Sequence, residues 1–233
     1  LSKIDEIRAQ PPRDWSREVV SEAGLQDLDA EAIALARENI RKHYGNRESL
    51  IDQLSDAELL DKAGLTLNGA ITHTALLLLG TPESARLMQG ALPKITWSLY
   101  EADGSVRTYQ HFGPPFLLTI DDVLAKIRNE EIRLLADPSS LLPMTTTEYD
   151  EWSLRELIGN AIAHQDYADG GKVNIGEFPD RMVFLNEGGF IPGTLEQALM
   201  SGYKPPYYRN PFLVDAMLHV GMLDQNAMGI RTV

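Results

Sequence analysis

The sequence predicts an α+β protein built in two parts, because helix-like and strand-like hydrophobic patterns alternate along it. Helical periodicity is clearest over residues 29–43 and 149–164, where apolar side chains recur every three or four positions. Strand-like alternation is clearest over 95–100 and 106–112, which flank Asp103-Gly104, a dipeptide typical of hairpin turns. We expect a tail or linker at residues 1–22 and a smaller middle region of helices and a β-hairpin at residues 23–140. A C-terminal domain should follow at residues 147–233.

Composition limits the classes of function. The chain has 233 residues, no cysteine and a net charge of −13. Without cysteine there is no disulfide, thiolate metal site or cysteine nucleophile, and the acidic balance argues against a main DNA-contacting surface in these residues. No apolar run approaches the roughly 18 residues of a membrane span and no signal peptide is seen, so we expect a cytoplasmic protein without membrane association. The start at Leu1 rather than at Met suggests a piece of a longer protein.

Three helices are expected in the middle region before the hairpin. The first, 29–43, carries one apolar face and should stop at Gly45-Asn46; this face consists of Ile33, Leu35, Ala36 and Ile40. The second covers 52–62, with Ser55 as its N-cap. A turn at 66–69 precedes the third, which covers 72–79 and ends at Gly80. After the hairpin we expect a long amphipathic helix over 118–136.

A stretch rich in Pro, Ser and Thr at 137–147 is the expected boundary between the two parts. The strong helix at 149–164 follows it, and then a turn at 169–171. The remaining expected elements are a hairpin of 172–178 and 181–186, a short helix at 195–200, a loop at 201–210, and a last helix at 211–220 that begins with proline.

The helix before Tyr167 carries the residues with the most chemical meaning. Glu156, Asn160 and His164 follow one another at steps of four, so they share one helix face. A carboxylate can orient or deprotonate a water, and the amide oxygen one turn away can ligate Mg²⁺. A structural alternative stays open: Ser153 and Glu156 fit a capping box, with Asn160 merely solvated and His164 favoured by the helix dipole. The capping box needs a start near Ser153, whereas the catalytic interpretation prefers a start near Thr147, which leaves Glu156 in the middle of the helix.

Glycine-bearing segments lie downstream of this helix. Asn186 precedes Gly188 and Gly189 at the end of a strand, and Gly229 lies close to the end of the chain. Glycines allow a backbone to approach a ligand closely, although ordinary turns use them too. Lys204 and Arg209 lie in a loop that could close over phosphates or could be a surface loop. The histidines show no ligand-type spacing, so no histidine metal site is expected at His43, His73, His111, His164 or His219.

Taken together, these segments resemble the RecG-related ATP-binding family, whose members are described as transcriptional regulators or as ATP-dependent DNA helicase-like proteins. The resemblance covers about residues 50–233. It is specific, because several ordered motifs agree. The helix from Arg155 to Tyr167 resembles the family's hallmark helix, and the other matching segments are 54–60, 67–80, 178–181, 186–193, 208–212 and 229–231.

The resemblance implies a C-terminal Bergerat (GHKL-like) ATPase fold, a mixed sheet with helices on one face. It implies ATP and Mg²⁺ as ligands, with Glu156 as the water-activating carboxylate and Asn160 as the Mg²⁺ ligand. Asn186 would lie where such ATPases carry an adenine-reading Asp, and the glycine boxes would contain Gly188, Gly189 and Gly229. In full-length members it also implies an N-terminal Schlafen/Alba-type nucleic-acid-binding domain, which we do not expect within this chain.

Two departures from the family pattern leave a second hypothesis open. Asn186 replaces the acidic residue, and the last glycine box keeps only Gly229, beside the larger Ala227 and Met228. The first hypothesis is therefore a regulator that binds ATP and Mg²⁺ and hydrolyses ATP slowly, and the second is a degenerate scaffold or dimerisation module without nucleotide binding. Similarity to other Bergerat proteins suggests a homodimer. DNA unwinding is not expected, since the chain has no G-x-x-x-x-G-K-[ST] phosphate loop.

Overall fold

A four-stranded mixed sheet organises the molecule. The computed structural model describes residues 13–43, 48–88, 90–91, 93–134, 144–189 and 208–223. The sheet has the order β4-β3-β7-β8 and consists of β4 (Val106–Phe112), β3 (Ile95–Tyr100), β7 (Val173–Glu177) and β8 (Met182–Leu185). Both expected hairpins are confirmed: β3 pairs antiparallel with β4, and β7 pairs antiparallel with β8. The two hairpins join through β3 and β7, which run parallel with Ile95 opposite Val173.

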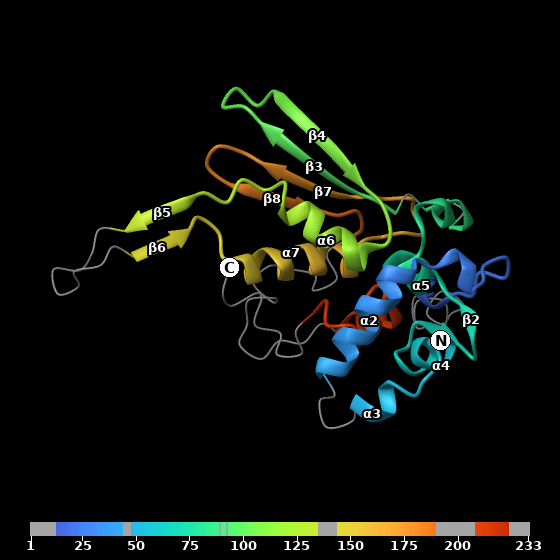
Figure 1. The fold of residues 1–233 in the computed structure, drawn as a ribbon. Helices are drawn as coiled ribbons and strands as arrows, with labels where there is room; N and C mark the ends of the chain where they lie inside the picture. Colours follow the sequence, from blue (N-terminus) through green and yellow to red (C-terminus); the bar gives the residue numbers. More distant parts are fainter. Residues whose placement is uncertain are drawn as a thin grey trace, which may run out of the picture.

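Two helices cover one face of this sheet (Figure 1): α6 (Phe116–Leu124) and α7 (Glu151–His164). The face that they cover is apolar, because alternate residues of β3 and β7 point toward it. Ile95, Trp97, Val173 and Ile175 are all buried there. One strand pair comes from each of the two expected parts, so the sheet crosses the expected boundary and joins them.

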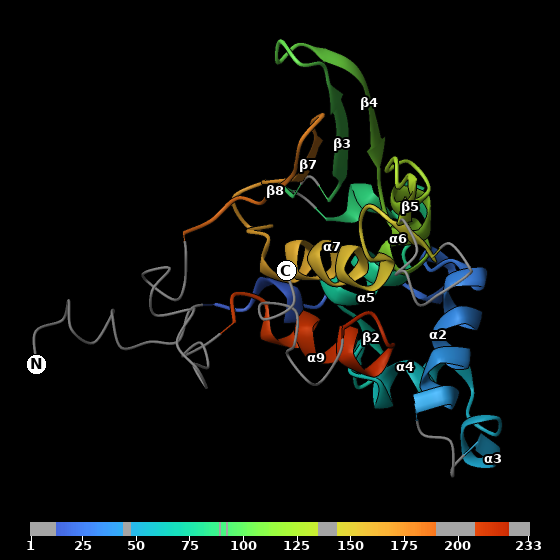
Figure 2. The same cartoon turned by 90° about the vertical axis from the view of Figure 1, so that its left-hand side faces the viewer.

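The remaining helices form a second layer below α7 (Figures 1 and 2). Its α-helices are α2 (Ala30–His43), α3 (Glu48–Ile51), α4 (Asp56–Lys62), α5 (His73–Leu79) and α9 (Pro211–His219). Short 3-10 turns and a small hairpin complete it, namely η1 (Trp15–Arg17), η2 (Leu25–Asp27), η4 (Pro82–Leu87), β1 (Thr66–Leu67) and β2 (Ala70–Ile71). In α5 every residue from Thr74 to Leu79 is buried, which makes this short helix the centre of the layer.

Local signals in the sequence identified several of these helices, although the helix expected over 52–62 begins only at Asp56 and α3 was not expected. Ser55 caps α4 in a capping box with Glu58, and Thr72 caps α5. The turn between β1 and β2 has Asn68 and Gly69 at positive φ, as a two-residue hairpin turn requires. Leu35 of α2 is half-buried, whereas Ile33, Ala36 and Ile40 are buried as expected.

Two expectations about the chain between the layers were wrong. The helix expected over 118–136 ends at Leu124, and its last part forms the strand β5 (Glu131–Leu134). This strand pairs with β6 (Met144–Thr147), which lies inside the expected boundary. The physical reason is the Asn129 side chain, which hydrogen-bonds both the backbone nitrogen and the backbone oxygen of Tyr149. These two bonds draw the chain on either side of the β5–β6 ribbon together, and the threonines of β6 favour a strand.

The expected N-terminal tail also differs from the structure over residues 13–22. Val20 and Ser16 are buried, and Val19 forms a β-bridge with Thr72. The prolines and charges of residues 1–22 suggested a linker, but Trp15 and Val20 pack against the rest of the protein. The expected short helix at 195–200 and most of the loop at 201–210 lie outside the described residues. No helix among the described residues has the length and apolar character to cross a membrane.

Candidate functional site

Glu156 and Asn160 form one hydrogen-bonded unit on α7. The helix begins at Glu151, and its N-cap is Asp150, whose carboxylate accepts from the Ser153 backbone nitrogen at 2.8 Å. The capping-box alternative for Ser153 and Glu156 was therefore wrong, and the helix starts expected at 149 and near Thr147 were wrong as well. Glu156 lies in the second turn, is 9% exposed, and accepts a hydrogen bond from Asn160 Nδ2 at 3.0 Å. Glu156 therefore lies inside the helix and does not cap it.

His164 ends the same helix in a different environment. Its ring lies against Tyr208, with 5.8 Å between the ring centroids. Burial lowers the pKa of His164, and the positive charge of Arg209 lowers it further. The ring is therefore neutral at pH 7, and a neutral ring gains little from the negative end of the helix dipole.

The segment after α7 fastens the glycine-bearing segment to the end of the helix. Gln165 is fully buried, and its side-chain oxygen accepts from the Glu187 backbone nitrogen at 3.0 Å. The Asp166 backbone nitrogen donates to the Glu187 carbonyl at 3.1 Å. These bonds bring Gly188 and Gly189, which the sequence singled out, next to the last turn of α7.

Arg209 closes this arrangement from the other side. Its guanidinium pairs with Asp166 at 2.6 Å and donates to the Gly189 carbonyl at 2.9 Å. Gly188 has φ +112°, and a Cβ built on it would lie 2.7 Å from the Arg209 guanidinium carbon, so only glycine fits there. The predicted contact of Arg209 with phosphate stays a prediction, and in this structure the guanidinium holds the protein's own loop.

Asn210 is a site residue that the sequence analysis missed. It is 2% exposed, and its side-chain nitrogen donates to the carbonyls of Ala163 and Gln165 at 3.0 and 2.8 Å. These are carbonyls at the C-terminal end of α7, which have no partner within the helix. The available signal was an Asn directly before Pro211, at the start of a helix, but nothing in the sequence pairs it with α7.

A hollow of about 300 Å³ lies at the start of the two parallel strands. Lys94 and Lys172 line it together with Glu187 and glycines 170, 171 and 188. The parallel register places the two lysines side by side, immediately before Ile95 and Val173. Neither lysine was singled out from the sequence, because their neighbourhood depends on strand pairing. A second hollow of similar volume lies between α6 and α7, and neither of the two includes Glu156 or Asn160.

The remaining predicted residues are placed as follows. Asn186 is exposed at the end of β8, and Lys204 and Gly229 lie outside the described residues. Among the described residues no three His, Asp or Glu side chains gather in a metal-binding group.

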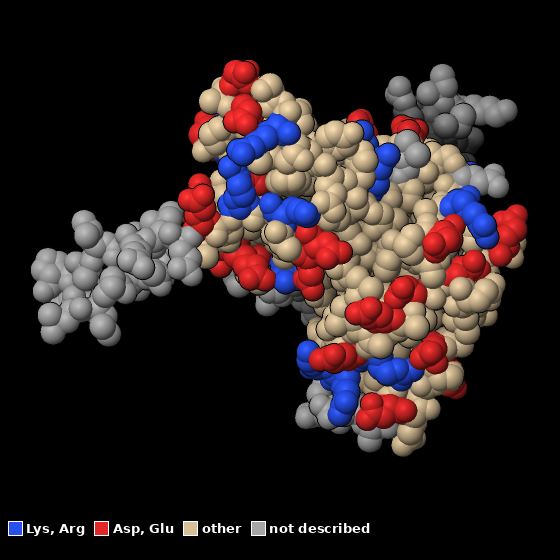
Figure 3. Space-filling model, turned by 45° about the horizontal axis from the view of Figure 1, so that its top comes forward, with Lys and Arg blue, Asp and Glu red and all other residues tan. Residues whose placement is uncertain are grey.

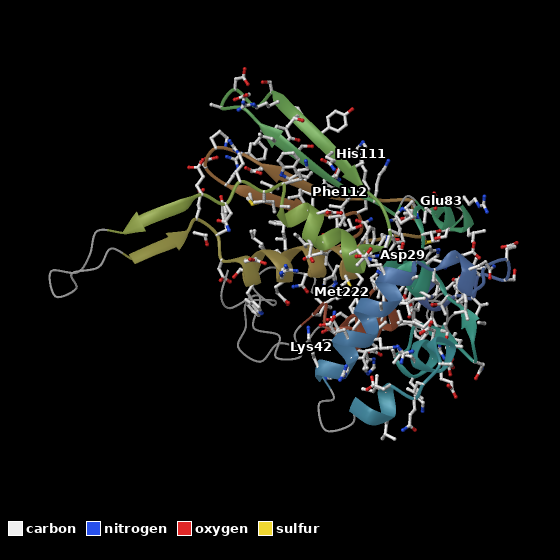
Figure 4. All side chains as sticks on the ribbon, in the orientation of Figure 1. Asp29, Lys42, Glu83, His111, Phe112 and Met222 are labelled. Atoms are coloured by element: carbon white, nitrogen blue, oxygen red, sulfur yellow. The ribbon has the colours of Figure 1, made fainter. Side chains whose placement is uncertain are left out.

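Of the histidines for which no metal site was expected, His111 lies on β4 and hydrogen-bonds Thr96 at 3.0 Å (Figure 4). Lys and Arg side chains are interspersed with Asp and Glu on the face drawn in Figure 3, and they form no continuous basic surface there.

Comparisons with known proteins give the chain two regional similarities. Residues 170–233 match the family described as "Putative ATP-dependent DNA helicase recG C-terminal", and residues 5–93 match a domain of unknown function, DUF8451. The C-terminal region is thus similar to a RecG-related, ATPase-like region. The matched residues include Asn186, Gly188 and Arg209 but begin after α7, so the Glu156–Asn160 pair lies outside them.

A solved structure resembles the fold as a whole. The crystal structure of the DIP2311 protein from Corynebacterium diphtheriae has a TM-score of 0.67 and 21% sequence identity, over 97% of this chain. The chain spans 43% of the length of that protein. No curated protein matches the chain.

Proposed function

We propose that the C-terminal region is a Bergerat-type domain that binds ATP with Mg²⁺ beside Glu156 and Asn160. One observation carries the proposal: the carboxylate and the amide that the sequence singled out meet on α7 at 3.0 Å. The similarity of residues 170–233 to the RecG C-terminal region supports it. A mixed sheet with helices on one face, the layout expected of a Bergerat domain, supports it as well.

The side chains of the pair suit a hard cation. Mg²⁺ prefers oxygen ligands and usually takes only one or two from the protein, with the others from water and phosphate. Because Asn160 donates its amide nitrogen to Glu156, its amide oxygen points elsewhere and would hold the cation. Bound Mg²⁺ would neutralise phosphate charge. The Glu156 carboxylate would orient or deprotonate the attacking water, giving slow hydrolysis.

The other predicted residues have roles that depend on this placement. Asn186 would read the adenine amino group, and its exposure at the end of β8 leaves it accessible for that bond. Gly188 and Gly189 would let the backbone approach the nucleotide. Arg209 would reach a phosphate only after its ion pair with Asp166 breaks. Its first role in this proposal is therefore to hold the backbone at Gly189 in place. His164, Lys204 and Gly229 complete the proposed nucleotide-binding set.

A second candidate function is a scaffold or dimerisation module that has lost nucleotide binding. The low exposure of Glu156 favours it, because a 9% exposed carboxylate needs rearrangement before it can meet a phosphate-bound water. The position of the two hollows away from Glu156 and Asn160 favours it too.

Isothermal titration with Mg²⁺ and a non-hydrolysable ATP analogue separates the two candidates. Binding to the wild type and its loss in Asn160→Ala is the result expected for the nucleotide proposal. The matched control is Asn39→Ala, which also removes one amide hydrogen bond, the 3.0 Å bond to the Val220 carbonyl, and should bind like the wild type. No heat of binding in the wild type would favour the scaffold.

Hydrolysis needs its own test. Glu156→Gln keeps the shape of the side chain and an oxygen that can accept from Asn160, but it cannot deprotonate water. We expect the variant to bind the analogue normally. Its rate of ATP hydrolysis should fall by a factor of at least about 10². An unchanged rate would remove Glu156 from the mechanism.

For the whole protein we propose a cytoplasmic regulator in which the nucleotide changes how an attached DNA-binding domain is held, without DNA unwinding. The DNA would be contacted by that further domain, in keeping with the acidic balance of this chain. A homodimer is proposed by analogy with other Bergerat proteins. Light scattering of the chain with and without ATP tests the dimer.

A further inference from the structure

The first turn of α9 is capped by residues almost two hundred positions upstream. Asp14 Oδ2 accepts a hydrogen bond from the Phe212 backbone nitrogen at 3.0 Å, and Ser16 Oγ accepts from the Leu213 backbone nitrogen at 3.1 Å. Since Pro211 has no N–H, these two bonds satisfy the donors at the helix start that no helix carbonyl can reach. We call residues Asp14, Trp15 and Ser16 the N-terminal clasp.

The clasp is itself rigidly built. Asp14 Oδ1 accepts from both the backbone nitrogen and the hydroxyl of Ser16, at 3.1 and 2.6 Å. The Trp15 ring stacks on His73 of α5, with 3.9 Å between the ring centroids, and on Tyr167 at 5.4 Å. The clasp therefore contacts α5, the start of α9 and the segment that follows α7.

The residue that would ordinarily cap α9 is engaged elsewhere. Asn210 precedes the helix but makes no side-chain capping bond to it. Its amide instead donates to the carbonyls of Ala163 and Gln165 at the end of α7. Asn210 thus fastens α9 to α7, and the clasp holds the start of α9 in the position from which Asn210 can do so.

The same set of contacts continues to the glycine-bearing segment. Gln165, whose carbonyl Asn210 holds, uses its side chain to accept from the Glu187 backbone nitrogen. Arg209, the residue before Asn210, holds Asp166 and the Gly189 carbonyl. Displacement of the start of α9 would therefore move both supports of residues 187–189.

We infer that the N-terminal clasp controls the order of the segment from Glu187 to Gly189, and that it couples the N-terminal part of the chain to the proposed nucleotide site. The effect on the nucleotide rests on the proposed function, whereas the effect on the segment does not. Coupling of this kind is reciprocal: release of the clasp weakens ligand binding by the same factor by which the ligand tightens the clasp.

Amide hydrogen exchange of the 233-residue chain without ligand tests the first part. Asp14→Ala removes the cap, and we expect exchange at Phe212 and Leu213 to become roughly fivefold faster, as for loss of a helix cap. Faster exchange should extend to Glu187. Asp14→Asn keeps one oxygen acceptor where Asp14 uses two, one for Phe212 and one for Ser16, so its exchange should lie between those of Asp14→Ala and the wild type. The matched control is Asp103→Ala, which loses the same kind of local bonds to Ser105 at the tip of the β3–β4 hairpin and should leave Glu187 unchanged.

The outcomes are distinct. Faster exchange confined to residues 212–213 would overturn the coupling, and so would equal effects of the two alanine variants at Glu187. If Asp14→Ala does not fold, Ser16→Ala takes its place with the same criteria. It removes the acceptor for Leu213 and the hydroxyl bond to Asp14, but it leaves Asp14 to cap Phe212.

Titration with the ATP analogue tests the second part. If the wild type binds, Asp14→Ala should bind at least about fivefold more weakly and Asp14→Asn with an affinity between the two. Equal affinity in all three would overturn the coupling to the ligand. If the wild type does not bind, the proposed function fails, and the exchange experiment decides the clasp by itself.

Discussion

Replacement of Asn210 should destabilise the protein more than its small side chain suggests. Its amide donates to two backbone carbonyls at 3.0 and 2.8 Å, and the residue is 2% exposed. In Asn210→Ala both carbonyls lose their donor where water cannot easily replace it. A lost hydrogen bond costs about 1 kcal/mol, and a buried group left without a partner costs about 1–3 kcal/mol. With partial relaxation we expect the free energy of unfolding to fall by about 2–4 kcal/mol.

Urea unfolding followed by far-ultraviolet circular dichroism measures this loss. Asn129→Ala is the matched control, because it also removes two bonds between an amide and the backbone, to Tyr149, but at a half-buried position. Since water can reach that position, the control should lose about 1 kcal/mol. A loss at Asn210 no larger than the loss at Asn129 would refute the reasoning.

A charged replacement adds a pH signature. In Asn210→Asp a carboxylate would face the carbonyls of Ala163 and Gln165, so the folded protein would favour the protonated acid, which can donate one bond. The folded-state pKa of this Asp would then be raised above the unfolded value of about 3.9. The stabilisation that the protonated Asp provides is fully present below the unfolded-state pKa of about 3.9 and is lost as the pH rises through the folded-state pKa. Relative to Asn210→Ala, the variant should be more stable at pH 4 than at pH 7, and a pH-independent difference would contradict this.

Three further predictions follow from the same region and its sheet. Burial and Arg209 lower the pKa of His164, so below about pH 6.5 the unfolded chain gains a proton there before the folded protein does, and the free energy of unfolding should fall. In urea titrations at pH 7 and pH 5.5, His164→Gln should show a smaller fall than the wild type. Gly171→Ala would place a Cβ in steric conflict with the Gln165 side-chain nitrogen, so we expect the free energy of unfolding in urea to fall by about 1–3 kcal/mol. A stability equal to the wild type would show that the Gln165 side chain can move away without cost. Glu177, 3% exposed, accepts from Trp97 Nε1 at 3.0 Å through one oxygen and from Arg128 Nε at 2.6 Å through the other, so Glu177→Ala should cost about 2 kcal/mol in thermal unfolding. Glu177→Gln keeps one acceptor oxygen for Trp97 and should cost clearly less; equal losses would assign the effect to the ion pair with Arg128 instead.

The sequence predicted the helices and hairpins whose signals are local. Ser55 was recognisable as a cap because a capping side chain bonds backbone nitrogens only three residues away. Both β-hairpins were recognisable because their strands flank short turns. Where a local signal competed with a distant contact, the prediction failed: the helical pattern after Leu124 gave way once Asn129 bonded Tyr149, twenty residues away.

The candidate site divides in the same way. Glu156 and Asn160 could be paired from the sequence, since one helical turn separates them and the helix was evident. Gln165, Asp166 and Asn210 could not be assigned, because their partners lie 20 to 50 residues away and their own types are common in ordinary turns.

The amino-acid sequence by itself determined the α+β character, most of the helix and strand positions, the acidic cysteine-free surface, and the pair on α7. These follow from hydrophobic period, capping and turn residues, which act over a few residues of chain. Only the tertiary structure decided that β3 pairs with β7, that Asn210 joins α9 to α7, and that Asp14 caps a helix nearly two hundred residues later. The physical reason is that a hydrogen bond depends on distance in space, and the order of residues along a chain does not specify which distant groups the packed core brings together.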